Sequence, residues 1–341
     1  MAYTTIKKPS DYFNTKLYTG TGASQSITGV GFQPDWTWIK NRSITANHHL
    51  FDVARGATKY ILTNSTNAEA TDAQQLQSFD SDGFTVGTNG NVNGSGNNIV
   101  AWNWLAANGT ASNTDGSINS TVSASTVSGF SIVSYTGTGA NATVGHGLSS
   151  APKMIIFKNT NSVRDWGVYH GSLSDPDNYL TLNQTYAQTT GFNFSNNTAP
   201  TSSVFYVGDH NRVNGSGDTY VAYCFADVQG YSKFGSYTGN GQADGTFIYT
   251  GFKPAFTMIK RTDSSGDWQL VDNKRLGYNV DNNALFPNLN NAEDTGDVVD
   301  ILSNGFKVRS STGTWNASGG SYIFMSFAEE PLVGDNPATA R

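Results

Sequence analysis

One block of sequence occurs three times and limits the folds open to this chain. The block reads NGSGNNIVAWNW at residues 93–104, NGSGDTYVAYCF at 214–225 and NASGGSYIFMSF at 316–327, and the three copies align without a gap. Each copy begins with a turn rich in Gly and continues as a strand with alternating side chains. Three such matches within 341 residues indicate three copies of one structural unit.

Four further features recur in the same order in each copy. A Tyr-Thr-Gly pentapeptide opens the copies at residues 18–22, 135–139 and 237–241. A lysine follows an apolar run that predicts a core strand: Lys40, Lys158 and Lys260. Twelve residues later stands Asp52, His170 or Asp272. A Gly-Phe pair comes next: Gly83–Phe84, Gly191–Phe192 and Gly305–Phe306.

The residue types within each unit favour strands. Aromatic residues make up 12% of the chain, charged residues only 13%, and no sustained helical period is present. We therefore predict an all-β fold of three tandem antiparallel β-sandwich domains, jelly-roll-like, of about 90–100 residues each. Units of this size can fold alone, so we expect them to be arranged like beads on a string.

The domain boundaries follow from changes in composition. We place the first repeat at 1–106, a Ser/Thr/Asn/Gly-rich linker at 107–128 and the second repeat at 129–228. The third repeat takes 229–331, and residues 332–341 form a C-terminal tail. Because the joint near residues 227–230 is short, we expect the second and third repeats to pack more rigidly together.

Charge and cysteine content exclude several classes of protein. The net charge is −6 and no dense Lys/Arg run is present, which argues against a nucleic-acid partner. No apolar stretch approaches the roughly 18 residues of a membrane span, and the start lacks the apolar region of a signal peptide. A single cysteine excludes an internal disulfide framework and a Cys-rich zinc site.

The repeats also help to separate residues of the fold from residues of a reaction. Asp52, His170 and Asp272 are metal-ligand types, yet no His-x-His motif or carboxylate cluster lies beside them. Cys224 stands in a strand without an evident base partner, and we find neither a G-x-S-x-G nor a Walker pattern. Glu329 and Glu330 would suit a glycosidase only if they faced a pocket together with another carboxylate. We therefore predict no enzyme, no metal and no cofactor.

Short acidic and Gly-rich stretches are interpreted as turns. Asp80–Gly83 resembles half of a calcium loop but has no acidic counterpart in the other copies, so we predict a turn that enters a strand. The Tyr-Thr-Gly pentapeptide lacks the lysine and the helix start of a phosphate loop. We predict that it ends the first strand of each unit, where glycines permit the turn.

Tryptophans are the remaining candidates for ligand contact. Trp166 and Trp268 each follow an aspartate, and this recurrence favours packing over sugar stacking. The first copy has Asn47–His48 there instead. Trp315 has no evident counterpart and is the one weak candidate for an exposed ligand-binding contact.

Several stretches resemble structural proteins of marine bacteriophages. These are the opening MAYTTIKKPSDYFNTKLYTGTG, the internal GFQPDWTWIKNRS and GFKPAFTMIKR, and the closing SYIFMSFAEEPLVGDNPATAR. The resemblance covers nearly the whole chain. It implies a virion protein with tandem β-rich domains, often of tail-fibre type, made in the host cytoplasm without a signal peptide. The family offers no agreed catalytic or binding residues.

Three functions remain open at this point. The first is a tail-fibre or receptor-binding type appendage that contacts a glycan or protein on the host surface. The second is a capsid decoration protein on the head, and the third is a carbohydrate-binding adhesin. The expected partners are other virion proteins and the host surface, without nucleic acid or membrane, and by analogy with fibres we expect a homo-oligomer such as a trimer. The first repeat begins almost at residue 11, which leaves no coiled-coil shaft and weighs against a long fibre.

Overall fold

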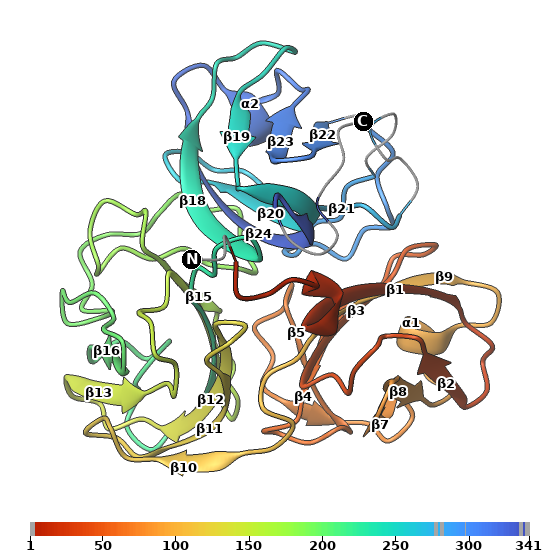
Figure 1. Cartoon of the computed structure of the whole chain (residues 1–341). Helices are drawn as coiled ribbons and strands as arrows, with labels where there is room; N and C mark the ends of the chain where they lie inside the picture. The colour runs from red at the N-terminus through yellow and green to blue at the C-terminus, as the bar shows by residue number, and fades with distance from the viewer. Residues whose placement is uncertain (1–3, 276–278, 280–282, 297, 334–336, 338–341) are drawn as a thin grey trace.

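The computed structural model is almost entirely β-structure in antiparallel sheets, which confirms the predicted all-β, sandwich-type class. It describes the chain except residues 1–3, 276–278, 280–282, 297, 334–336 and 338–341. Three lobes surround a common centre (Figure 1). Most of the expected tail at 332–341 therefore lies outside the described residues. Among the described residues, no helix has the length and apolar character needed to cross a membrane.

Each repeat contributes one larger sheet, and the strands of the three sheets follow the same order. In the first repeat the order is β1 (Phe13–Thr19), β9 (Asn98–Trp104), β3 (Trp36–Asn41) and β4 (His48–Asp52), extended by β5 (Lys59–Leu62) and β6 (Ala70–Thr71). In the second it is β12 (Phe130–Thr136), β17 (Thr219–Phe225), β14 (Met154–Asn159) and β15 (Gly167–His170). In the third it is β18 (Ser232–Thr238), β24 (Ser321–Pro331), β20 (Phe252–Arg261) and β21 (Gln269–Asp272).

A smaller sheet packs on one face of each larger sheet and lies at the periphery in Figure 1. These sheets are β2 (Gln25–Thr28), β8 (Gly83–Val86) and β7 (Leu76–Asp80); then β13 (Ala142–Gly145) and β16 (Val204–Val207); then β19 (Phe247–Tyr249), β23 (Gly305–Val308) and β22 (Val299–Leu302). The described helices are short: a 3-10 turn at Pro9–Asp11, α1 (Gly90–Asn93) and α2 (Gly313–Asn316). Asp80–Gly83 forms the turn between β7 and β8, as predicted.

The other face of each larger sheet packs into one central core shared by all three repeats. Trp36 stacks on Tyr223 with ring centroids 4.6 Å apart, Trp104 meets Phe327 at 5.6 Å, and Phe225 meets Phe327 at 6.0 Å. The repeats are therefore not arranged like beads on a string. Each buried aromatic side chain contributes roughly 1.5–3 kcal/mol, and a separated repeat would expose this whole face to water.

The segment at 107–128 differs from the expected linker. It contains β10 (Ala111–Asn113) and β11 (Ser120–Ser125), and β11 pairs along its whole length with β12. Val122 of β11 is buried in the core of the second repeat. Ser120 and Ser123 of this strand are buried and Thr121 is exposed, yet the same small polar residues are typical of a flexible linker, which is why composition alone suggested one.

A buried asparagine holds the Tyr-Thr-Gly pentapeptide against the recurring turn. In the second repeat the Thr138 N–H donates to Asn214 Oδ1 at 2.7 Å. Asn214 Nδ2 donates to the carbonyls of Ala140 and Gly208 at 2.6 and 2.7 Å. Gly137 has no room for a side chain, since a Cβ there would lie 2.4 Å from a backbone carbonyl oxygen. The same fully buried asparagine stands in every repeat: Asn93, Asn214 and Asn316.

Candidate ligand-binding site in the second repeat

Each recurring lysine is buried and bonds to a loop of a different repeat. Lys158 Nζ donates to the carbonyl of Thr66 in the first repeat at 3.0 Å and to that of Arg164 at 2.7 Å. The equivalent bonds between repeats are Lys260 to Thr185 at 3.1 Å and Lys40 to Asn290 at 3.3 Å. The second repeat thus binds the first, the third binds the second and the first binds the third. Burial lowers the pKa of each lysine from 10.5 to about 8.

The recurring aspartates also bond between repeats. The Tyr223 hydroxyl of the second repeat donates to Asp52 Oδ2 of the first at 2.7 Å. Trp102 Nε1 of the first repeat donates to Asp272 Oδ2 of the third at 2.9 Å. Each aspartate also accepts from an arginine three residues later in the chain. Asp52 and Asp272 therefore recur because their carboxylates join neighbouring repeats.

The second repeat has His170 where the other repeats have aspartate, and the residue that faces this position from the neighbouring repeat differs as well. Met325 stands where the other repeats have Trp102 and Tyr223, and its side chain has no hydrogen to donate. His170 Nε2 instead lies 3.3 Å from the Phe324 carbonyl of the third repeat. Burial lowers the pKa of His170 to about 4, so the ring is neutral near pH 7. Among the described residues, no group of three or more His, Cys, Asp or Glu gathers in a way that could hold a metal.

The tryptophans that recur after aspartate are packing residues, as predicted. Trp166 and Trp268 are buried, and their Nε1 atoms donate across the repeat boundary to the carbonyls of Leu62 and Thr181 at 2.9 and 3.0 Å. Their counterpart in the first repeat is His48, which is also buried.

The structure corrects the expectation that Trp315 makes an exposed contact. Its side chain is only 4% exposed and belongs to the apolar core of the third repeat. The Tyr237 hydroxyl donates to the Trp315 carbonyl at 2.7 Å. In the other repeats the corresponding tyrosine bonds in the same way to Val92 or Val213. Trp315 therefore has counterparts, and the change from Val to Trp concealed them in the sequence.

Cys224 and Glu329, the other candidate reactive side chains, are engaged in contacts within the protein. Cys224 is buried, and burial raises the pKa of its thiol. Glu329 forms ion pairs with Lys253 at 3.0 Å and Lys274 at 3.3 Å. Burial acts to raise the pKa of Glu329, but the combined hydrogen bonds and charges of Lys253 and Lys274 hold it below its ordinary value.

The Gly-Phe pair of the second repeat does not match those of the other two. Phe84 pairs with Ile27, and Phe205 takes the equivalent place in the second repeat, opposite Val144. Phe192 is instead 51% exposed, whereas Phe84 is fully buried. The equivalence assigned from the sequence is wrong, because Phe205 follows Val204 and lacks the preceding glycine, whereas Phe192 follows Gly191 by coincidence.

Phe192 lies just before a segment that replaces a strand. The small sheet of the second repeat has two strands, whereas those of the first and third have three. The Gly208 N–H donates to the Phe194 carbonyl at 2.9 Å, just as the Gly87 N–H donates to Gln75 immediately before β7. Residues 195–200 therefore stand in the place of β7, but they form a bend and a turn and no strand. Asn196 and Asn197 adopt φ values of 53° and 47°, conformations that asparagine tolerates better than most residues.

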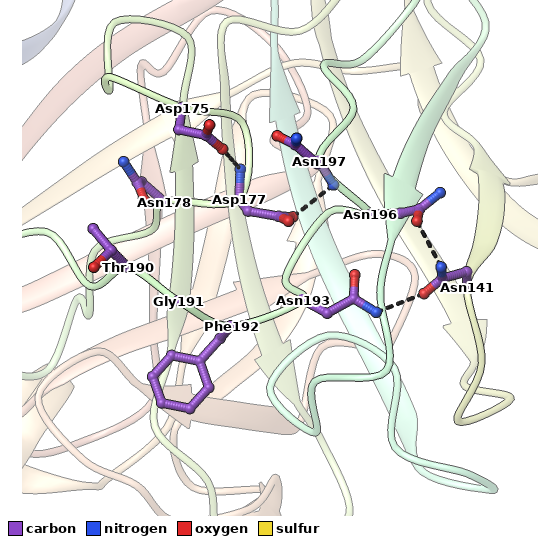
Figure 2. Close-up of a pocket in the computed structure, with 10 residues that line it drawn as sticks. All are labelled: Asn141, Asp175, Asp177, Asn178, Thr190, Gly191, Phe192, Asn193, Asn196 and Asn197. Carbon is purple, nitrogen blue, oxygen red and sulfur yellow. Dashed lines mark hydrogen bonds between the residues drawn. The ribbon is translucent and has the colours of Figure 1, made fainter.

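A surface depression of about 590 Å³ opens beside this loop. It is lined mostly by amides and carboxylates: Asn141, Asp175, Asp177, Asn178, Thr190, Gly191, Phe192, Asn193, Asn196 and Asn197. Figure 2 shows the Phe192 ring at one side and a chain of amides at the other.

Hydrogen bonds hold the polar side of the depression in place. The Asp177 carboxylate accepts the backbone N–H groups of Ser195 and Asn197 at 2.7 and 2.8 Å. Asn141 donates to Asn196 at 2.6 Å and accepts from Asn193 at 2.7 Å (Figure 2). The loop is thereby ordered before any ligand arrives, which lowers the entropic cost of binding.

The chemistry of this depression suits a sugar. An exposed aromatic ring can pack on the C–H face of a pyranose, while amides and carboxylates bond to its hydroxyl groups. Phe192 is supported by edge contacts with Tyr179 and His210, with ring centroids at 6.3 and 5.4 Å. Asp175 is exposed at the rim, where its carboxylate accepts the Asp177 N–H at 2.9 Å. No motif in the sequence predicted this site. The exposed ring of Phe192 and the depression beside it in the folded protein reveal the site.

The chain belongs to the family described as a domain of unknown function (DUF7483), whose model matches residues 8–331. The comparison with curated proteins gave no match.

Proposed function

We propose that this protein is a non-enzymatic binding protein on the exterior of a bacteriophage virion, and that the depression at Phe192 binds a glycan of the host surface. The observation that carries the proposal is the exposed ring of Phe192 beside ordered amide and carboxylate groups. Phe84, Phe205 and Phe306 occupy equivalent positions in the three repeats and are all buried, whereas Phe192 is an additional, exposed phenylalanine of the second repeat.

A structural role fits the reactive side chains of the repeats. The recurring Lys, Asp and His residues form hydrogen bonds with neighbouring repeats, and Cys224 is fully buried in the core of the second repeat. These groups hold the three repeats together. The placement on a virion rests on the resemblance of the opening, internal and closing stretches to phage structural proteins.

A capsid decoration protein is the second candidate. Its compact shape favours this role, because three lobes around a common centre form a globular unit and not the elongated shape of a fibre (Figure 1). Locating the protein on the assembled particle by electron microscopy separates the two. Density on the head lattice would exclude the tail appendage.

A glycan array with the purified protein tests the binding site. We expect the wild-type protein to bind a host glycan and Phe192→Ala to bind it at least about fivefold more weakly, since an aromatic contact contributes roughly 1 kcal/mol or more. Ile44→Ala, at an exposed apolar residue of the first repeat, is the matched control and should bind normally. Equal binding by Phe192→Ala would refute the site. Failure of the wild-type protein to bind any host glycan or host cell would refute the proposed function.

A further inference from the structure

One sheet edge in the second repeat is covered by a segment of the same chain. Ile118 forms a parallel bridge with Val144 of β13, and its N–H donates to the Thr143 carbonyl at 2.9 Å. The Ser120 hydroxyl donates to the Gly145 carbonyl at 2.8 Å. The Ile118 side chain is buried and joins the core of that repeat.

The equivalent edge of the third repeat is β19, the outer strand of its small sheet. Ile248 is buried, whereas Phe247 is 44% and Tyr249 is 56% exposed. The Thr246 carbonyl accepts from Val308 N–H of β23 at 3.0 Å. Because hydrogen-bonding direction alternates along an antiparallel strand, the backbone groups of Phe247 and Tyr249 point away from β23.

Strand register relates the two edges residue by residue. Val144 pairs with Phe205 and Ile248 pairs with Phe306, so Phe247 corresponds to Thr143 and Tyr249 to Gly145. The carbonyl of Phe247 therefore occupies the position at which Thr143 accepts the Ile118 N–H.

The first repeat has the same edge with a different surface. Its β2 presents the exposed residues Ser26 and Thr28 at these positions. Small polar side chains make a sheet edge a poor docking surface, whereas aromatic side chains make it a favourable one. The aromatic edge of β19 is therefore specific to the third repeat.

We propose that the edge of β19 binds an extended segment of a partner protein as an added parallel strand. One β-branched apolar residue of the segment, flanked by small polar residues as in Gly-Ser-Ile-Asn-Ser of this chain, covers Ile248. Its backbone bonds to the Phe247 carbonyl and the Tyr249 N–H, and the two exposed rings pack on its neighbours. This inference is independent of the glycan site, which lies in another repeat.

A second surface feature favours the same edge. A depression of about 470 Å³ adjoins Tyr249 and is lined by polar groups that include Asp227, Gln229 and Lys233. It offers space and hydrogen-bonding groups to a segment that continues beyond the strand.

The test uses a synthetic peptide with the sequence of residues 114–122, TDGSINSTV, added to the whole ¹⁵N-labelled protein. We expect the amide signals of Phe247 to Tyr249 to shift and the Tyr249 amide to become protected from exchange. The double variant Phe247→Ser/Tyr249→Thr copies the edge of the first repeat and should bind at least about tenfold more weakly. Tyr249→Pro removes the outward N–H and should abolish binding. Ser26→Ala/Thr28→Ala, at the edge of β2, is the control and should bind as the wild type does.

Three results would overturn the proposal. One is the absence of binding up to about 1 mM peptide, and another is equal binding by the Phe247→Ser/Tyr249→Thr variant. The third is a wild-type dimer in solution that this variant abolishes, because the edge would then serve a second copy of the chain. If Tyr249→Pro fails to fold, the double variant still decides the outcome. Glycan binding should be unchanged in the double variant, which separates this test from that of the proposed function.

Discussion

At the scale of single residues, donors and acceptors are matched across the repeat boundaries. The buried carboxylate of Asp52 has a hydroxyl donor in Tyr223, and Asp272 has an indole donor in Trp102. His170 supplies the donor itself where its neighbour is methionine. A buried acceptor without a hydrogen-bond donor destabilises the fold. Each of these three positions therefore depends on a residue 154 to 171 positions away in the chain.

Tyr223→Phe tests this matching. The variant removes only the hydroxyl and leaves the Asp52 carboxylate short of one donor. We expect a loss of about 1–3 kcal/mol in the free energy of unfolding, measured by urea denaturation. Tyr186→Phe, at a tyrosine that is 55% exposed, is the control and should change stability little. Equal stability of the two variants would show that the Tyr223 hydroxyl contributes nothing.

At the scale of elements, the buried asparagine determines the shape of each turn. Asn214 bonds to three backbone groups, from Thr138, Ala140 and Gly208, and so joins the end of β12 to the turn before β17. No other residue type offers both an acceptor and two donors in so short a side chain. This accounts for the recurrence of the pentapeptide and of the turn that begins with the asparagine, which reads Asn-Gly-Ser-Gly in two repeats and Asn-Ala-Ser-Gly in the third.

Asn214→Ala should therefore destabilise the protein by about 2–4 kcal/mol, because several buried backbone groups lose their partners together. Asn93→Ala and Asn316→Ala should have effects of similar size. Asn67→Ala, at an exposed position, is the control. The melting temperature and urea denaturation both report the change. A loss below about 0.5 kcal/mol in all three variants would contradict the role assigned to the asparagine.

At the scale of the whole molecule, the three buried lysines close a ring of repeats. Each Nζ atom bonds to a carbonyl of the preceding repeat in a cyclic order, and the central core packs the three inner faces together. The repeats therefore depend on one another for burial, and we infer that they unfold as one unit.

The lowered pKa values of these lysines give a pH dependence with a definite sign. Between about pH 8 and 10.5 the unfolded chain keeps protons that the folded chain has released. The free energy of unfolding should therefore rise with pH across this window, by up to about 3 kcal/mol for each lysine. Urea denaturation of the wild type and Lys158→Met, at pH 7.5 and at about pH 9, measures the difference, and the tyrosines that begin to ionise in the unfolded chain are common to both proteins. An identical rise in both proteins would show that Lys158 does not titrate as stated.

Much of the fold was predictable because it depends on local pattern. The three units, their core strands and the turn at Asp80–Gly83 follow from periodicity and glycine placement, which neighbouring residues determine. By contrast, nothing in the local sequence indicates which residue of another repeat a side chain will contact. The Ser/Thr-rich run at residues 120–125 likewise fits both a linker and a strand, and only β12 beside it decides between them.

The sequence by itself determined that this chain is an all-β protein of three related units and which residues recur in them. Only the tertiary structure decided that the units share one core, that Trp315 is buried and that Phe192 is exposed. The physical reason is that periodicity records which side of a strand is apolar. Whether that side meets solvent, its own small sheet or another repeat depends on contacts between residues far apart in the chain.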